Sequence, residues 1–147
     1  MVTFGPDRRE DQSNEVHISR VRHGLQPSLG KHDPDAIVAM HTDDTVFHMH
    51  GYAAPATGRG AVRDAIAALF AQVPDLRFEN RRVHFGEDHF VSEYEVSGTA
   101  NGKHFACPGA DVFTLRDGRI ARKDTYIDWL AYQRQVGADL AAPPAGS

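Results

Sequence analysis

The segment Pro108–Trp129, PGADVFTLRDGRIARKDTYIDW, constrains the fold of this chain more than any other. Two runs rich in apolar and β-branched residues, 110–115 and 120–127, flank a central Asp117-Gly118 pair. Asp-Gly between such runs is a strong signal for a tight hairpin, because both residues tolerate a positive φ angle. The segment therefore predicts two antiparallel strands.

Asp111 lies inside the first of these strands, on the same face as Phe113 and Leu115. A carboxylate on an apolar face is either a paired structural group or a working acid. Desolvation there favours the neutral acid, which can donate a hydrogen bond to a developing oxyanion. Asp111 is therefore the first candidate catalytic residue.

The composition is that of an ordinary globular protein. The chain has 147 residues, enough for one domain with a real core, and is 41% hydrophobic and 24% charged. The formal net charge is −4 with histidine neutral, and no block of basic residues occurs. We therefore expect no nucleic acid partner.

Cysteine content and hydropathy narrow the protein class further. Cys107 is the only cysteine, which excludes an intrachain disulfide and a thiolate metal cluster. No apolar run approaches the roughly 20 residues that a membrane-spanning helix needs, and the first residues lack a signal-peptide pattern. We expect a cytoplasmic protein with no membrane partner.

The chain predicts helices first and strands later. Residues 1–12 are expected to be flexible, residues 13–137 to form a single domain, and residues 138–147 to form a flexible tail. Asp33 and Pro34 provide a helix cap and a proline at the first helical position. The periodicities predict helices over 13–29, 34–40, 61–73 and 129–136, and strands over 45–50, 76–85, 89–99, 103–115 and 120–127. This order indicates an α+β fold, with helices packed on one face of a curved antiparallel sheet.

The predicted strand 45–50 carries two different faces. Phe47 and Met49 share one face, and His48 and His50 share the other. Thr42-Asp43-Asp44, just before it, is expected to close the preceding helix.

Three stretches, HDPDAIVAMHTDDTVFHMHG, TGRGAVRDAIAALFAQVPDLRFE and PGADVFTLRDGRI, resemble the SnoaL-like branch of the nuclear transport factor 2-like superfamily. The resemblance runs from about Val16 to Gly137. It implies a cone-shaped fold in which a curved antiparallel sheet encloses a deep pocket closed by three helices. It implies less about activity, because this fold hosts isomerases, dehydratases, epoxide hydrolases, polyketide cyclases and non-catalytic binders.

The resemblance to ketosteroid isomerases is carried by a single position. Asp111 falls where these enzymes place the protonated aspartate of their oxyanion hole. Their general-base aspartate falls on Met49 and their oxyanion tyrosine on Leu25. Ketosteroid isomerase activity is therefore not expected.

The other enzyme sets of the superfamily match less well. In SnoaL-like cyclases the acid–base aspartate of the last strand corresponds to Thr125. The arginine, two aspartates, tyrosine and asparagine of limonene epoxide hydrolases fall on Tyr94, Val96, Thr125, Phe47 and Met49. Asp111 is thus the one catalytic position that the resemblance retains.

The two histidines of strand 45–50 have different expected positions. In the resemblance, His48 lies on the outer sheet face and His50 lies at the strand end by the pocket mouth. His50 is a candidate general base, because imidazole titrates near neutral pH; the alternative is a solvated loop histidine. Two histidines alone do not make a metal site, which needs a third protein ligand, so we expect no metal and no cofactor.

The register of the last hairpin decides what faces Asp111. A strict two-residue turn sets Asp111 opposite Asp124, with Tyr126 on the same face, whereas a bulged turn brings Lys123 and Thr125 to the pocket instead. The family positions favour the second register. We expect Lys123 to line the pocket mouth and to leave Asp111 mostly unpaired. Its alternatives are to extend to the rim, to pair with Asp111, to polarise a carbonyl or to form a Schiff base.

Two functions from different classes remain open. The first is a cofactor-independent enzyme for a small hydrophobic, oxygenated molecule of polyketide or terpenoid type, with cyclisation, isomerisation or dehydration as the reaction. Asp111 would stabilise the oxyanion, and His50 or Lys123 would move the proton. The second is a non-catalytic protein that binds a hydrophobic ligand or a partner chain. In both cases the expected pocket residues are Phe47, Met49, Tyr94, Phe113, Thr125 and Trp129.

The outer sheet face predicts a homodimer. Val112 and Thr114 alternate with pocket residues and give that face β-branched side chains, which a monomer would leave exposed to water.

Overall fold

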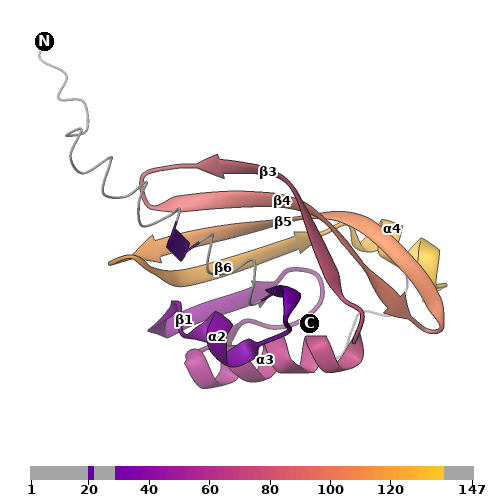
Figure 1. Ribbon diagram of the computed structural model, residues 1–147, viewed down its shortest axis with the longest axis horizontal. Coiled ribbons are helices and arrows are strands. Elements are labelled where there is room, and N and C mark those ends of the chain that lie inside the picture. The colour runs from indigo at the N-terminus through magenta and orange to yellow at the C-terminus, as the bar shows by residue number, and fades with distance from the viewer. Residues whose placement is uncertain (1–19, 22–28, 138–147) are drawn as a thin grey trace, which may run out of the picture.

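The computed structural model describes residues 20, 21 and 29–137, and this part of the chain forms a curved, open sheet of six strands with three helices (Figure 1). The order across the sheet is β2-β1-β6-β5-β4-β3. The expected α+β fold is confirmed. The helix predicted over 13–29 lies largely outside the described residues, as do the two termini predicted to be flexible.

Helix α2 (Pro34–Val38) begins as the sequence predicts. The Asp33 side chain accepts a hydrogen bond from the Ala36 backbone N–H at 3.1 Å, and Pro34 opens the helix. The expected helix-closing role of Thr42-Asp43-Asp44 is wrong, because strand β1 (His41–Met49) already includes these residues. The backbone N–H of Ile120 donates to the Met40 carbonyl at 2.9 Å. This long-range contact ties Met40 to β6, and the helix ends at Val38 instead of at the predicted residue 40.

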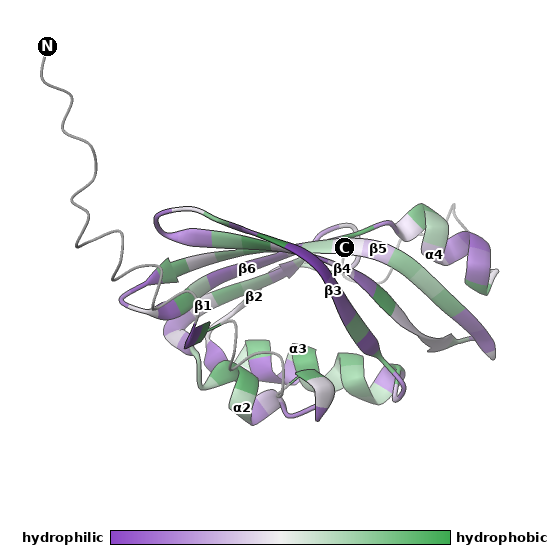
Figure 2. Cartoon of the chain, turned by 45° about the horizontal axis from the view of Figure 1, so that its top comes forward, coloured by the Kyte–Doolittle hydropathy of each residue, from purple (hydrophilic) through white to green (hydrophobic). Residues whose placement is uncertain are grey.

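Helix α3 (Arg59–Gln72) closes one side of the sheet. Its buried side chains Val62, Ile66 and Phe70 recur every four residues and form a single apolar stripe. Figure 2 shows this helix with both hydrophobic and hydrophilic bands. The short strand β2 (Ala56–Thr57), which pairs with β1, was not predicted, because two residues in a loop carry no periodicity.

The C-terminal part is the predicted antiparallel meander. Its strands are β3 (Arg77–Phe85), β4 (His89–Ala100), β5 (Lys103–Arg116) and β6 (Arg119–Ile127). The turn pairs Asn101-Gly102 and Asp117-Gly118 all have positive φ angles, between 52° and 74°. This backbone matches the right-handed twist of the strands. Helix α4 (Trp129–Val136) follows, with Asp128 as its N-cap.

One junction of the sheet is parallel. Strand β1 runs parallel to β6, with Phe47 beside Lys123 and Met49 beside Thr125. The expectation of an antiparallel sheet is therefore wrong at this junction. No hairpin links the two strands, since α3 and four strands intervene, and β1 adds to the free edge of the meander in the same direction as β6.

The last hairpin contains both features that the sequence offered as alternatives. Arg116 pairs with Arg119 across a strict two-residue turn, yet Asp111 pairs with Thr125. Ile120 faces Leu115 and Arg122 faces Thr114, so Ala121 between them has no partner. The bulge thus lies inside β6 rather than in the turn, and it produces the register that the family positions favour.

Candidate functional site

A hollow of about 230 Å³ lies between the inner face of the sheet and helices α3 and α4. Its wall is mostly aromatic and aliphatic, and polar groups gather at two places. The aromatic residues are Phe47, Tyr52, Phe78, Tyr94, Phe105, Trp129 and Tyr132. The cavity can therefore hold a small apolar molecule and present polar groups to it at defined positions.

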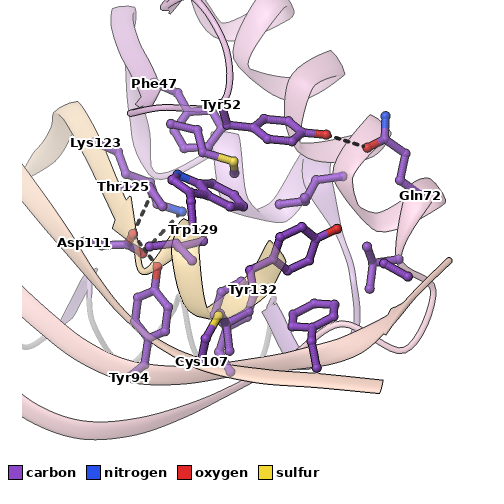
Figure 3. Close-up of a pocket in the computed structure, with 18 of the residues that line it drawn as sticks. Phe47, Tyr52, Gln72, Tyr94, Cys107, Asp111, Lys123, Thr125, Trp129 and Tyr132 are labelled. Carbon is purple, nitrogen blue, oxygen red and sulfur yellow. Dashed lines mark hydrogen bonds and ion pairs between the residues drawn. The ribbon is translucent and has the colours of Figure 1, made fainter. Parts of the chain in front are cut away.

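Asp111 is the centre of the first polar group (Figure 3). Its carboxyl Oδ1 accepts a hydrogen bond from the Tyr94 hydroxyl at 2.9 Å and from the Thr125 hydroxyl at 2.6 Å. The side chain is buried, with only 8% exposed. Two donors on one oxygen hold the carboxyl in a fixed orientation. Oδ1 therefore acts as an acceptor, and the hydrogen-bond donation suggested by the sequence would need a proton on Oδ2, beside Lys123.

Lys123 brings a positive charge into the same group. Its Nζ lies 3.6 Å from Asp111 Oδ2, and 5.1 Å and 5.6 Å from the ring centres of Phe47 and Phe113. The expected position at the pocket mouth is wrong, because the Lys123 side chain is only 10% exposed and lies inside. At 3.6 Å the pair is ionic but longer than a charge-assisted hydrogen bond, which is about 2.7–2.9 Å. Lys123 therefore keeps donors available for a ligand.

Tyr94 reaches Asp111 across a glycine. A Cβ atom on Gly109 would lie 2.7 Å from the Tyr94 ring, so only glycine leaves room for this ring over β5. Burial, together with the negative charge of Asp111 and the hydrogen bond to it, raises the pKa of Tyr94 far above its usual value. Tyr94 therefore stays protonated and donates a hydrogen bond to Asp111. The sequence predicted Tyr94 only as a residue of the apolar pocket wall, not as a partner of Asp111.

Most of the substrate-binding residues expected from the sequence do line the cavity. Phe47, Met49, Tyr94, Thr125 and Trp129 are all on its wall. Phe113 is not one of the lining residues, because its ring stacks on Phe90 at 4.4 Å and packs beneath Lys123.

His50 lies on the opposite face of the sheet. Its Nε2 is 2.7 Å from Asp124 Oδ1, and its ring stacks on Tyr126 at 4.3 Å. The side chain therefore does not point into the cavity, and the predicted placement of this general base at the pocket mouth is wrong. The strand alternation that puts Phe47 and Met49 inside puts His48 and His50 outside.

The second polar group lies on the helical side of the cavity and was missed from the sequence. The Tyr52 hydroxyl donates to the Gln72 side-chain oxygen at 3.0 Å. Tyr52 lies in the loop after β1 and Gln72 ends α3, so their proximity has no local signal. Cys107 also lines the cavity, and burial raises the pKa of its thiol to about 11. This thiol is therefore protonated near neutral pH and serves as a small apolar group, as expected.

The fold and cavity define a class: a hollow α+β cone whose inner sheet face carries a buried acid. Residues 15–123 match the family described as SnoaL-like domain, and the chain belongs to that family. No curated protein sequence matches the chain. Among the described residues, no helix is long and apolar enough to cross a membrane.

Solved structures support the same fold at low sequence identity. A hypothetical protein with a ketosteroid isomerase-like fold from Catenulispora acidiphila, solved with trimethylamine, is 20% identical with a TM-score of 0.76, over 84% of this chain and 97% of its own. A SnoaL-like polyketide cyclase structure from Jannaschia is 19% identical with a TM-score of 0.73, over 95% and 99%. An LEH-like epoxide hydrolase of M. tuberculosis is 17% identical with a TM-score of 0.70, over 82% and 90%. The fold is thus nuclear transport factor 2-like.

Proposed function

We propose that this protein is a cofactor-independent acid–base enzyme for a small, hydrophobic, oxygenated molecule of polyketide or terpenoid type. The observation that carries the proposal is the Asp111–Lys123 pair inside an apolar cavity, with the two groups 3.6 Å apart. A base and a cation at this spacing fit a carbonyl compound that has an acidic C–H bond next to its carbonyl.

The two oxygens of Asp111 have different roles in this proposal. Oδ1 is held by Tyr94 and Thr125, so Oδ2 is the oxygen that takes the proton. As the C–H bond breaks, its electron pair moves into the carbonyl and leaves negative charge on the carbonyl oxygen, which the Lys123 ammonium stabilises. In an isomerisation the proton then returns to another carbon. In a cyclisation the enolate carbon attacks a second carbonyl of the same molecule, and the proton passes to the oxygen of that carbonyl. In a dehydration the proton passes to the hydroxyl that departs as water.

The test uses exchange of hydrogen rather than a known substrate. Cyclic enones and ketones of one or two rings are incubated in deuterated water, and deuterium gained next to the carbonyl is measured by NMR. We expect Asp111→Asn to reduce the exchange rate by about 10²–10³, the typical loss for one electrostatic catalytic group. The control Lys103→Met removes an exposed lysine from the same strand as Asp111 and leaves the rate unchanged.

Ligand binding and stability are measured on the same variants. Retained binding and an unchanged melting temperature in Asp111→Asn assign the lost rate to chemistry. Equal exchange rates in Asp111→Asn and the unmodified protein contradict the proposal.

A second function has its own support. The oxygens of Asp111 already have three partners, which is also typical of a buried structural group. A non-catalytic protein that binds a hydrophobic ligand would bind members of the panel without exchanging or converting any of them.

A further inference from the structure

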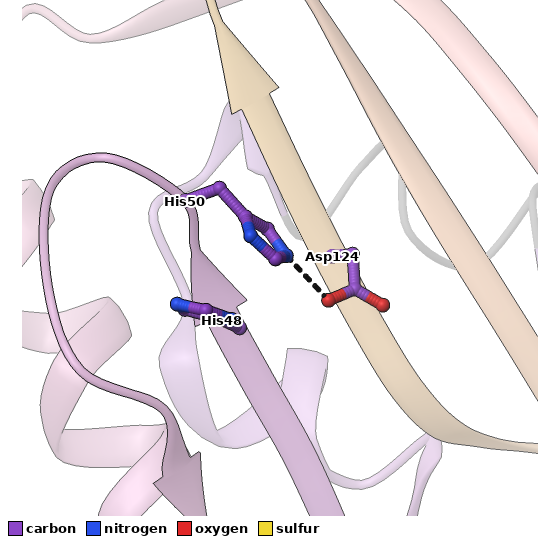
Figure 4. A group of neighbouring side chains, drawn as sticks. All are labelled: His48, His50 and Asp124. Atoms are coloured by element: carbon purple, nitrogen blue, oxygen red, sulfur yellow. Dashed lines mark hydrogen bonds and ion pairs between the residues drawn. The ribbon is translucent and has the colours of Figure 1, made fainter.

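A compact group of possible metal ligands lies on the outer face of the sheet, behind the cavity floor. His48 and His50 alternate near the end of β1, and Asp124 lies beside His48 on the parallel strand β6 (Figure 4). One ligand atom from each residue lies within 4.8 Å of the others. The neighbours of Asp124 in β6, Lys123 and Thr125, face the cavity, so this group lies on the opposite face from the proposed active site.

The spacing of these atoms is near that of ligands around one ion. His50 Nε2 and Asp124 Oδ1 are 2.7 Å apart, while two ligands bound at about 2.0–2.1 Å to a tetrahedral ion lie roughly 3.3 Å apart. The ligand atom of His48 lies within 4.8 Å of the other two and has to move closer to reach this spacing. Its ring centre is 3.7 Å from that of His50, and no hydrogen bond reaches it from the described residues. An ion would give the His48 ring the polar partner that this part of the chain does not supply.

The group is held in place by its surroundings. Arg122 donates to both oxygens of Asp124, at 2.8 Å and 2.9 Å. Each oxygen has a second lone pair, so Arg122 and an ion can share the carboxylate.

His50 is the most firmly placed of the possible ligands. Its ring stacks on Tyr126, and its backbone N–H donates to the Thr125 carbonyl at 3.0 Å. His50 itself lies in the turn directly after β1, and these two contacts fix its position there.

We propose that His48, His50 and Asp124 bind one divalent transition metal ion of the Zn²⁺ type, with a remaining position open to water or another ligand. Imidazole nitrogen with one carboxylate oxygen suits Zn²⁺, Ni²⁺ and Cu²⁺, whereas Mg²⁺ and Ca²⁺ prefer sites made of oxygen ligands. This site is separate from the cavity, and the inference does not rest on the proposed function.

The test is a titration of untagged, chelator-treated protein. Isothermal titration calorimetry with ZnCl₂ is expected to give one ion per chain, and Co²⁺ is expected to give the visible absorption of a bound ion. MgCl₂ is expected to give no binding. His48→Ala and Asp124→Asn are each expected to weaken Zn²⁺ binding at least about 10-fold, because changes to outer-shell partners alone cost 10–100-fold.

His84→Ala is the matched control. His84 also contacts a carboxylate, at 2.6 Å from Glu93 Oε2, but on an exposed part of the sheet, so its loss is expected to leave Zn²⁺ binding unchanged. His48 has no hydrogen bond from the described residues, so His48→Ala is expected to fold. The test therefore remains decisive even if Asp124→Asn unfolds. Zn²⁺ binding that is absent from the unmodified protein, or unchanged in His48→Ala, overturns the proposal.

Discussion

At the scale of single residues, some buried ionisable groups of this protein have an oppositely charged neighbour, and others do not. Asp111 and Lys123 are buried together, and each has the other's charge nearby. His41 is fully buried with a hydrogen bond to the Thr45 hydroxyl at 2.8 Å, and its Nε2 has no hydrogen-bond partner among the described residues. Burial, followed by the positive charges of Lys123 and Arg59, lowers the pKa of His41 to about 4. His41 is therefore a neutral ring in the folded protein near neutral pH.

This lowered pKa predicts a loss of stability in mild acid. The unfolded chain binds a proton at His41 near pH 6.5, whereas the folded protein does so only near pH 4. The stabilisation is fully present above pH 6.5 and is lost as the pH falls toward 4. From pH 7 to pH 4 the contribution to the free energy of unfolding falls by about 3 kcal/mol. Urea unfolding at several pH values measures it.

His41→Asn is expected to remove this part of the pH dependence, while His89→Asn, at an exposed histidine, is expected to retain it. A His41→Asn protein with the same pH dependence as the unmodified protein would show that His41 is not responsible.

At the scale of elements, the bulge in β6 decides which face of that strand enters the cavity. Beyond Ala121, pairing continues regularly from Thr114 with Arg122 to Asp111 with Thr125. The same register turns Asp124 outward, where Arg122 and His50 bind it. The single unpaired residue Ala121 therefore sets the register in which Lys123 and Thr125 face the cavity and Asp124 faces outward.

Deletion of single residues tests this role of the bulge. Removing Ala121 leaves every other pair of the hairpin in register, so we expect a folded protein that retains ligand binding, with a stability loss on the order of 1 kcal/mol. Removing Val112 from the paired strand β5 turns Asp111 to the other face, and we expect loss of ligand binding. Thermal unfolding followed by circular dichroism, with a binding assay, compares the two. Similar loss in both deletions would contradict the assignment of the register.

At the scale of the whole molecule, the two faces of the sheet have different surroundings. The inner face is covered by helices and encloses the cavity, while Val112 and Thr114 lie half-buried on the outer face with the exposed Tyr126 nearby. We propose that a second copy of the chain covers this outer face. Val112, Thr114 and Tyr126 give this face exposed apolar surface beside the polar group of His48, His50 and Asp124, and exposed apolar surface of this kind marks interaction sites.

Light scattering after size-exclusion chromatography tests this proposal at micromolar concentration. We expect twice the mass of one chain for the unmodified protein, and a shift toward the monomer for Val112→Arg, because a long charged side chain on this face opposes close packing of a second copy. Leu130→Arg, on an exposed position of α4, is the control and is expected to leave the dimer intact. A monomer mass for the unmodified protein would refute the proposed interface.

The sequence alone determined the features that depend on near neighbours. The turn pairs Asn101-Gly102 and Asp117-Gly118 set the two hairpins, and the spacing of Val62, Ile66 and Phe70 set the buried face of α3. Strand alternation also placed Asp111 on the inner face. These features follow from backbone conformation and periodicity within a few residues.

The tertiary structure decided how these pieces meet. The parallel junction of β1 with β6 and the unpaired Ala121 depend on contacts between distant segments, and local propensity does not specify them. They bring Lys123 to Asp111, and they bring His50 to Asp124 across 74 positions of sequence. The sequence placed Asp111 on the cavity wall correctly and misplaced His50, because strand pairing, rather than residue type, determines which charged groups share a face.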